Sequence, residues 1–589
     1  MVLTVDEVFQ AVGDYHKFQW LMLAIIGYTN FAVGAIPSLI VTFITAEPNW
    51  QCVKGYNSSI CNFNESIGLT SKHYKDRCDM PREAWTYVEG FTSTVTEYDL
   101  VCDKSILQSV AQSCYWVGAL LGLLLGGYLS DKFGRRKIFI CGIVSVTVAT
   151  WIMIFPKSFE LFIICRVFIG IGSGFYNATY LILLMEFTTA KHRAKIGAYS
   201  FFFWAAALLV LALVGYLVPD WRYFLLVTAC LALPCLFISW FVPESIRWLQ
   251  LHGKDDVVRK QLEKVAHMNR KEMPSEDVKI NESIKQSGSY KHLLLSWHFA
   301  KTLLITWNIW FATALVYYGI SYSSVDIGGN RYLNFALTSI VELPSFILCM
   351  VIANKYFLKR CLSNCLQIVK LGTLSRLIYH IVPYDTKKKI LSFPLIYVKL
   401  KVKIPFKIVF YSLKLNFEMN FCRLKQILYY FRYGRKKIVV IGLIVAFLAS
   451  ISSVFVAYDC LNDVKTAARI ILTLLAKFFI SMSFSGIYIW SAELFPTCIR
   501  TMAYGTSSGA GRFGSFASSY IVWLIRVHSM LPYGIMGIIC LQAAITALFL
   551  TETKGKPTLE TLDDMLQEST KEVQSIALIE RTDCVQDHS

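Results

Sequence analysis

The sequence predicts an all-α membrane protein with twelve transmembrane helices arranged as two six-helix pseudo-repeats. Of its 589 residues, 55% are hydrophobic and only 17% are charged. The mean hydropathy of +0.48 is too high for a soluble protein of this length. Twelve apolar segments have about the 20 residues that a helix needs to cross a membrane. A basic, glycine-centred turn occurs twice, as GGYLSDKFGRRKIF at Gly126 to Phe139 and YFRYGRKKIVV at Tyr430 to Val440.

The expected spans follow one another with short connections, apart from three longer loops. The first apolar run is too long and too weakly flanked to be a cleaved signal peptide. From the N-terminus, the spans are expected at Trp20–Thr45, Ile106–Gly127, Ile138–Phe155, Phe159–Leu184, Ala198–Val218, Tyr223–Val242, Thr302–Ser321, Leu333–Ala353, Ile438–Tyr458, Ala468–Trp490, Ala503–Ile525 and Leu531–Leu550.

A polar central loop divides the chain into two halves, and each half holds one copy of the basic turn after its second span. Such duplication is typical of transporters, which rock one half against the other. The central loop contains GKDDVVRKQLEKVAHMNRKEM, which fits a short charged cytoplasmic helix or a solvated linker. The expected segments are the first half 1–242 with a long outer loop at about 46–104, the central loop 243–301, the second half 302–552 with a basic insertion at about 359–430, and the tail 553–589.

Cysteines and glycosylation sequons orient the chain. The first long loop holds Cys52, Cys61, Cys78 and Cys102, and four cysteines in one polar loop favour disulfides in an oxidising compartment. Asn57 and Asn64 begin Asn-x-Ser sequons in the same loop, which indicates an extracellular or lumenal position. Alternate loops, such as SDKFGRRK and TTAKHRAK, carry excess Lys and Arg, so both termini are expected in the cytoplasm.

The net charge of +18 belongs mainly to one segment. From Lys355 to Lys437 the chain has 19 Lys and Arg against only Asp385 and Glu418, which leaves the remainder close to neutral. A basic surface spread over the whole protein would indicate an acidic partner. Because the charge is local, no nucleic-acid partner is expected.

Several motifs resemble known transporters. The turn at Gly127, Asp131, Gly134, Arg135 and Arg136 is similar to the signature loop of the major facilitator superfamily. The sequences PESIRWL and SAELFPTCIR, together with the cysteine-bearing loop, resemble the organic cation, anion and zwitterion transporters of solute carrier family 22. Sugar porters share the first of these motifs but usually have a short first outer loop. The resemblance implies the major facilitator fold and covers nearly the whole chain except about Lys359 to Tyr430.

The uncovered segment splits a loop that is otherwise only a few residues long in the family. Alternations such as KLKVKIPFK fit basic strands or a segment attracted to anionic lipid. We favour a translated, unspliced intron, in which case transcripts across spans 8 and 9 should be about 70 codons shorter than this sequence implies.

The resemblance also implies a latch at the cytoplasmic side, made of ion pairs that are broken and remade during transport. In the second copy of the turn, Phe431 and Arg432 stand where the acid is expected. The candidate gating residues are Gly127, Asp131, Gly134, Arg135, Arg136, Arg166, Glu186, Arg193, Glu493 and Arg500.

Charged residues inside membrane spans are costly and therefore candidates for a binding site. Arg166 lies among Gly170, Gly172 and Gly174, which favours a structural or gating role. The resemblance places Arg512 where cation carriers usually have an aspartate and anion or carnitine carriers an arginine. A guanidinium there would attract a carboxylate.

The other charges in the spans have two interpretations. Lys477 adds positive potential, or else it pairs with Glu342 or extends to the membrane surface. Glu342 beside one or two bases suits a zwitterion. Some cation transporters carry a lysine at the position of Gly174. Asn177 lies one turn beyond that position and is a further candidate for the site.

Aromatic residues are expected to complete the site. Trp310 and Tyr317 are seven residues apart and share one helix face. The resemblance implies that they hold a quaternary ammonium by cation–π contact, worth up to about 2 kcal/mol. Tyr318 and Phe484 are weaker candidates. Without the resemblance, packing or lipid contact is the better explanation of such aromatics.

The sequence therefore predicts a plasma-membrane transporter, and not an enzyme, that moves small organic ions by alternating access. Carnitine-like or betaine-like zwitterions and organic anions are the expected substrates, and organic cations are the alternative. A second alternative is a transport-dead or mispredicted chain, because the insertion interrupts the second half. No cofactor and no metal site are expected, and sodium or counter-ion coupling is left open.

Overall fold

The computed structural model describes residues 5–53, 61, 66–69, 71–88, 90–273, 297–353, 434–456 and 463–554. Residues 1–346 and 435–589 form one compact unit, and residues 347–434 form another. The predicted basic insertion, the sequon residues Asn57 and Asn64 and nearly all of the predicted tail lie outside the described residues.

The first predicted span is an interrupted helix. It consists of α2 (Lys17–Thr29), the π-helical turn η1 (Asn30–Ala35), α3 (Ile36–Leu39) and α4 (Val41–Ile44). Pro37 accounts for the irregular middle, because proline has no backbone N–H to donate and its ring crowds the preceding helical turn. The interruption leaves main-chain groups available to side chains of neighbouring helices.

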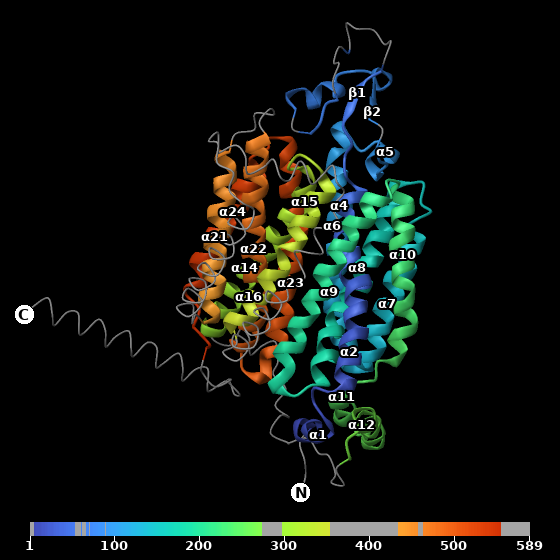
Figure 1. Cartoon of the computed structure of the whole chain (residues 1–589), viewed down its shortest axis with the longest axis vertical. Coiled ribbons are helices and arrows are strands. Elements are labelled where there is room, and N and C mark those ends of the chain that lie inside the picture. Colours follow the sequence, from blue (N-terminus) through green and yellow to red (C-terminus); the bar gives the residue numbers. More distant parts are fainter. Residues whose placement is uncertain are drawn as a thin grey trace, which may run out of the picture. The chain divides into compact units, whose positions relative to one another are not determined.

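A helix occupies each of the other predicted spans. In Figure 1 the helices of the first half, coloured blue to green, lie beside the yellow to red helices of the second half. The first half continues with α6 (Ile106–Phe133), α7 (Arg135–Ile152), α8 (Phe159–Glu186), α9 (Ala190–Leu217) and α10 (Trp221–Ile238). The second half contains α14 (Trp297–Ser323), α15 (Arg331–Ile340), α16 (Glu342–Ala353), α21 (Arg435–Phe455), α22 (Asp463–Glu493), α23 (Thr497–Trp523) and α24 (Leu531–Ala547).

Nine helical segments of the described residues are long and apolar enough to cross a membrane. The other three predicted spans coincide with α7, α23 and α24. Helix α7 begins with three basic residues, α23 is rich in serine and glycine, and α24 has only 17 residues. The count of twelve spans therefore stays a prediction.

Glycines allow the helices to approach closely. A Cβ atom on Gly118 would lie 2.2 Å from the carbonyl oxygen of Val167, and one on Gly170 would lie 2.2 Å from that of Tyr115. Helices α6 and α8 therefore pack backbone against backbone, as the glycines near Arg166 predicted. In the second half, Gly514 of α23 lies equally close to the carbonyl of Phe311 in α14.

One end of this unit, here called the disulfide end, carries the first long loop. Strands β1 (Trp50–Cys52) and β2 (Trp85–Tyr87) pair antiparallel, and α5 (Thr94–Tyr98) follows them. Disulfides join Cys52 to Cys61 and Cys78 to Cys102, so all four predicted cysteines are paired. The second disulfide ties the loop to the start of α6.

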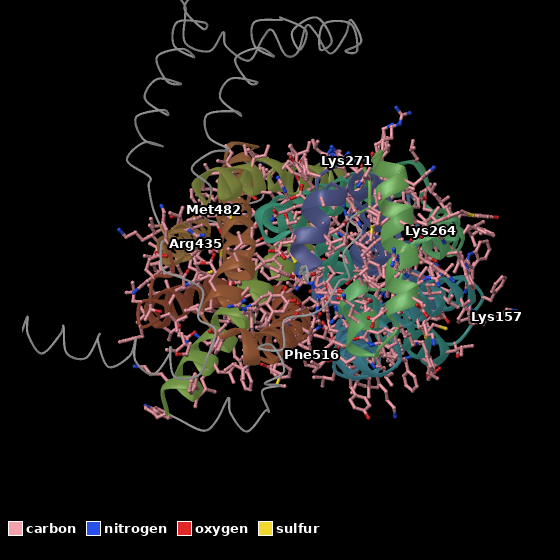
Figure 2. All side chains as sticks on the ribbon, turned by 90° about the horizontal axis from the view of Figure 1, so that it is seen from below. Lys157, Lys264, Lys271, Arg435, Met482 and Phe516 are labelled. Carbon is pink, nitrogen blue, oxygen red and sulfur yellow. A yellow bond between two sulfur atoms is a disulfide. The ribbon has the colours of Figure 1, made fainter. Side chains whose placement is uncertain are left out.

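The opposite end, here called the signature-loop end, carries α1 (Val5–Val12), α11 (Ile246–Leu251) and α12 (Asp255–Asn269). Helix α12 confirms the predicted charged helix in the central loop. The Asn269 side chain donates to the carbonyls of Val12 and Gly13 and accepts from the N–H of Phe18, which fastens α12 to the first span. Figure 2 views this end, with Lys264 on the side of the first half and Arg435 among helices of the second.

Candidate substrate site and gate loops

Two of the predicted charges form a buried pair between α16 and α22. The Lys477 ammonium lies 3.0 Å from Oε1 of Glu342, and their side chains are 1% and 0% exposed. Lys477 also donates to Ser321 Oγ at 2.7 Å, and the Tyr317 hydroxyl donates to Glu342 at 2.7 Å. The two charges cancel, in agreement with the interpretation of Lys477 as the partner of Glu342.

The same lysine covers one of the predicted cavity aromatics. Lys477 Nζ lies 3.3 Å from the centre of the Tyr317 ring. This ring therefore already holds an internal ammonium group by cation–π contact. A substrate ammonium could use this face only after Lys477 had moved away.

The predicted aromatic residues form one connected cluster. Trp310 packs against Phe484 at 5.9 Å between ring centres and against Tyr488 at 4.6 Å. Tyr317 lies 5.3 Å from Phe484 and 5.0 Å from Tyr318. Trp310 and Tyr317 thus share one face of α14, as their spacing predicted. Both side chains are buried.

Arg512 of α23 differs from the paired charges Lys477 and Glu342, because no acid among the described residues neutralises it. No hydrogen bond or ion pair reaches its guanidinium from the residues that the structure describes. The guanidinium lies 5.6 Å from the centre of the Trp116 ring of α6. Tyr115, Tyr318 and Tyr488 lie close enough to interact with it electrostatically. The Arg512 side chain is partly exposed.

Aromatic residues of both halves surround this guanidinium. Tyr318 of the second half lies 4.5 Å from Trp116 of the first, edge to face. Asn177 belongs to α8, where its amide donates to the Ser173 carbonyl at 2.7 Å. The geometry brings Tyr318 and Arg512 to the same aromatic environment. Among the described residues, the hydrogen bonds of the Asn177 side chain stay within α8.

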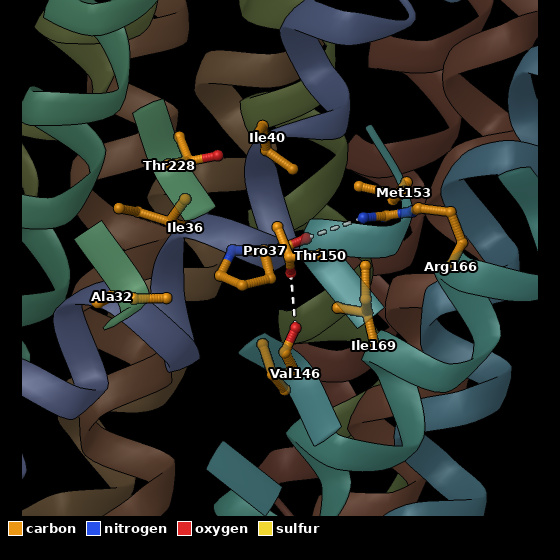
Figure 3. A pocket seen from close by; sticks show the side chains of 11 residues that line it. Ala32, Ile36, Pro37, Ile40, Val146, Thr150, Met153, Arg166, Ile169 and Thr228 are labelled. Carbon is orange, nitrogen blue, oxygen red and sulfur yellow. Dashed lines mark hydrogen bonds between the residues drawn. The ribbon is translucent and has the colours of Figure 1, made fainter. Parts of the chain in front are cut away.

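Arg166 is completely buried and holds three helices together. Its guanidinium donates to the carbonyl of Pro37 in α3 at 3.1 Å and to that of Ala111 in α6 at 3.3 Å. Figure 3 shows this side chain beside a cavity of about 10 Å³ that Thr150 also lines. Two main-chain carbonyls thus accept from Nε and Nη1, whereas Nη2 has no hydrogen-bond partner among the described residues. Contacts to the main chain of two neighbouring helices fit the structural role that its glycine-rich surroundings predicted.

The first signature turn is built around a carboxylate that the prediction did not include. Glu244, from PESIRWL, accepts from the N–H of Arg136 at 2.9 Å and so caps the start of α7. Gly134 has φ +108°, and a Cβ atom there would lie 2.4 Å from Glu244 Oε2. Glycine is therefore required at this position, whereas a Cβ on Gly127 would meet nothing within 4 Å.

Arginines of the first turn bind groups within the first half. Arg135 pairs with Glu186 at the end of α8, and its Nη1 donates to Ser245. The Asp131 carbonyl accepts from Trp248 Nε1 at 2.8 Å. The side chain of Arg193 lies outside the described part of the chain.

The second turn repeats this arrangement. Arg435 Nη2 lies 3.1 Å from Glu493 Oε1 at the end of α22, and the N–H of Arg435 donates to Glu552 at 2.8 Å. Arg500 donates to the carbonyl of Phe495 at 3.1 Å. Glu552, like Glu244, is the first acid after the sixth helix of its half. That shared position is the signal by which both capping carboxylates could have been found.

Comparison with known proteins identifies the family. The model of the family described as sugar (and other) transporter matches residues 27–343 and 396–566. The chain belongs to this family of major facilitator transporters. It is therefore a transporter and not an enzyme. The predicted resemblance to solute carrier family 22 is confirmed by the relatives that the chain matches along nearly its whole length.

Three relatives are similar to the chain along nearly its whole length, and two of them are named organic cation transporters. Solute carrier family 22 member 15 of Xenopus tropicalis is 26% identical over 96% of this chain and 91% of its own length. Human organic cation/carnitine transporter 2 is 26% identical over 95% of this chain and 94% of its own. The organic cation transporter protein of Drosophila melanogaster is 25% identical, with the same coverage as the human relative.

Solved structures confirm the major facilitator fold. The xylose transporter XylE from E. coli, in an inward open conformation, matches with a TM-score of 0.52 and 16% identity over 93% of this chain and 99% of its own. XylE bound to 6-bromo-6-deoxy-D-glucose gives a TM-score of 0.54 and 15% identity, over 94% and 98% of the two chains.

Proposed function

We propose that this transporter carries small organic ions that bear a carboxylate, either carnitine-like or betaine-like zwitterions or organic anions, by alternating access. The uncompensated guanidinium of Arg512 is the observation that carries the proposal. Lys477 and Glu342 neutralise each other at 3.0 Å, so Arg512 contributes the unbalanced charge of this region. A guanidinium binds a carboxylate through two parallel hydrogen bonds and repels a cation.

The aromatic surroundings of Arg512 support the same substrate class. The guanidinium lies 5.6 Å from the centre of the Trp116 ring, and Tyr318 and Tyr488, from two other helices, are close enough to interact with it electrostatically. Such rings bind an ammonium group that lies a few ångströms from the carboxylate, as in a betaine. A plain anion would use only the guanidinium, so both classes fit this region.

We further propose that the disulfide end faces the outside of the plasma membrane and that both termini are cytoplasmic. The two disulfides require an oxidising compartment, and they lie at one end of the helices only. In this orientation the signature turns face the cytoplasm. The segment borders predicted from the sequence remain part of this proposal.

The test is uptake of labelled carnitine, a model organic anion and tetraethylammonium by cells that express the chain with and without residues 359–430. Arg512→Asp should lower carboxylate uptake by roughly 10-fold to 100-fold, because a charged hydrogen-bonded contact contributes about 1.5 to 3 kcal/mol. Arg512→Lys keeps the charge without the paired geometry and is the matched control, with an intermediate loss. Unchanged uptake in Arg512→Asp at equal surface expression would remove Arg512 from the site.

Organic cations are the second candidate, and Glu342 is the observation that favours them. Its Oε2 atom has no hydrogen-bond partner among the described residues, so the carboxylate has unused capacity for a cation. Lys477→Met would free both Glu342 and the Tyr317 ring face. Tetraethylammonium uptake by the unaltered chain, without any carboxylate uptake, would favour this candidate. Absence of all uptake in either form at the cell surface would indicate a transport-dead chain.

A further inference from the structure

Four charged side chains lie where the two halves meet at the disulfide end. Glu47 follows α4, and Arg77 lies in the long loop beside Cys78; both belong to the first half. Asp326 is the last residue of the 3-10 turn that follows α14, and Arg526 is the last residue of the turn that follows α23; both belong to the second half. Their charges sum to zero within one small region.

In the observed state, Glu47 is the centre of this group. Its carboxylate pairs with Arg77 through Oε1 and lies 3.1 Å from Arg526 Nη2 through Oε2. The Tyr74 hydroxyl donates to it at 2.9 Å and the Gln108 amide at 3.3 Å. The side chains of Arg77 and Glu47 are only 1% and 5% exposed. This is a buried network and not a surface ion pair.

The contact between Glu47 and Arg526 crosses from one half to the other. Arg526 also donates to Gln108 in α6, which strengthens the same crossing. A cavity of about 30 Å³ adjoins this contact, and Asp326 lines it together with Arg526. Asp326 interacts electrostatically with Arg526 and with Arg331. Arg526 thus has an acid on each side of the boundary.

Opening this end requires Arg526 to leave Glu47. Breaking a buried pair is costly when one charge is left alone in the buried environment. Here neither charge is left alone, because Arg77 moves with Glu47 and Asp326 moves with Arg526. The disulfide between Cys78 and Cys102 holds Arg77 on the first half, next to the start of α6.

We propose that Glu47, Arg77, Asp326 and Arg526 form the gate of the disulfide end, and that opening separates them into two neutral pairs. The first half keeps Glu47 with Arg77, and the second half keeps Asp326 with Arg526. The disulfide-bonded loop therefore contributes to the gate, since its Arg77 stays paired with Glu47 when Arg526 moves away. This inference rests on the proposed alternating access.

The gate makes predictions of opposite sign for neighbouring residues. Arg77→Gln and Asp326→Asn each remove the charge that stabilises a separated half, so they should favour the closed state. Arg526→Gln removes the contact across the boundary and should favour the open state. Substitutions of residues that only stabilise the fold would not shift the open and closed states in opposite directions.

The accessibility of position 109 measures whether the gate is open or closed. The Ser109 hydroxyl donates to the Ser519 carbonyl at 3.0 Å across the same boundary. A Ser109→Cys variant is labelled in intact cells with a membrane-impermeant thiol reagent, against the unaltered chain as background. Labelling should slow by about threefold or more with Arg77→Gln or Asp326→Asn and accelerate by a similar factor with Arg526→Gln. Arg82→Gln is the matched control, because Arg82 lies in the same loop but pairs with Asp99 at the surface.

The proposal is overturned if Arg77→Gln and Arg526→Gln shift the labelling rate in the same direction, or if neither changes it. Should Arg77→Gln fail to reach the cell surface, Asp326→Asn tests the second pair by itself. The labelling rate needs no substrate, so it separates this inference from the proposed function. Loss of carboxylate uptake with the expected labelling shifts would leave the gate in place and reject only the substrate class.

Discussion

The two signature turns have diverged in sequence but keep the same contacts. In the first turn, Glu244 accepts from the Arg136 N–H at 2.9 Å, and Arg135 pairs with Glu186. In the second, Glu552 accepts from the Arg435 N–H at 2.8 Å, and Arg435 pairs with Glu493. A carboxylate after the sixth helix therefore caps the third helix in each half.

The two turns share a carboxylate at the N-terminus of a helix, where it is electrostatically favourable. Unpaired N–H groups and the helix dipole attract a carboxylate regardless of the side chains around them. What differs is the bracing. Both turns have a basic residue that donates to a carbonyl just after the sixth helix, Arg136 to Trp240 and Lys436 to Leu548. The first turn is also held by Trp248 of α11, which donates to the Asp131 carbonyl. We therefore expect the first turn to be the more rigid member of the pair.

The largest effect is expected from Gly134→Ala. The new Cβ would lie 2.4 Å from the Glu244 carboxylate, at a backbone φ of +108° that alanine disfavours. Strain and loss of the cap together should cost about 2 to 4 kcal/mol. Thermal unfolding in detergent measures the loss. Gly127→Ala, in the same motif, is the control and should be neutral or slightly stabilising, because a Cβ there meets nothing within 4 Å. Equal losses in the two variants would contradict this account.

Much of this architecture could be predicted from the sequence. Apolar length and loop charge located the spans, and cysteine clustering predicted the disulfide-bonded loop. The duplicated turn predicted the two halves. The family match and the XylE structures confirm the fold. Arg135, Glu186 and Glu493 are found in ion pairs at the turns, where the resemblance placed a latch.

The capping carboxylates and the gate charges could not be predicted in the same way. Glu244 and Glu552 act on backbone N–H groups more than a hundred residues away, and only a comparison of the two halves reveals their shared position. The contact of Glu47 with Arg526 joins residues 479 apart in the chain. Such pairs depend on how the halves meet, which no local pattern encodes. The occupation of the Tyr317 face by Lys477 was missed for the same reason.

Removal of each cap compares the turns directly. Glu244→Ala and Glu552→Ala should each cost about 0.5 to 2 kcal/mol, because a helix start loses its acceptor. The Glu244 variant should lose more, since this carboxylate also attracts the Arg135 guanidinium. Melting temperatures of purified protein measure both. Glu263→Ala is the control, because its pair with Arg259 is exposed and should contribute little. A larger loss of stability in Glu552→Ala than in Glu244→Ala would mean that the second turn is the more rigid one.

Double-mutant cycles would then compare the arginine pairs. The coupling between Arg135 and Glu186 should be about 1 kcal/mol, and that between Arg435 and Glu493 about half as much. The reason is burial: the first pair is 17% and 13% exposed, and the second 20% and 26%. Glutamine substitutions at all four positions supply the cycles, with unfolding free energies as the readout. Equal couplings would mean that exposure does not distinguish the two turns.

The smallest effect concerns a further brace of the first half, at Asp14. Its carboxylate accepts from Thr189 Oγ1 at 2.6 Å and contacts His192 Nδ1 at 2.9 Å, which joins the start of the first span to α9. Burial raises the pKa of Asp14, but the hydrogen bonds from Thr189 and His192 outweigh it, so the pKa lies below its ordinary value of 3.8. A lowered pKa contributes stability above pH 3.8 that is lost as the pH falls through the folded-state value.

Asp14→Asn should therefore be less stable than the unaltered protein by up to about 1 kcal/mol at pH 6. The difference should begin to shrink as the pH falls below about 4 and should vanish below the lowered pKa of Asp14, where both proteins are uncharged at this position. Melting temperatures of the two proteins between pH 6 and pH 3 give the curve. A difference that stays constant to pH 3 would assign the loss to packing of the side chain. In that case the ionised Asp14 carboxylate would not contribute to the stronger bracing of the first half relative to the second.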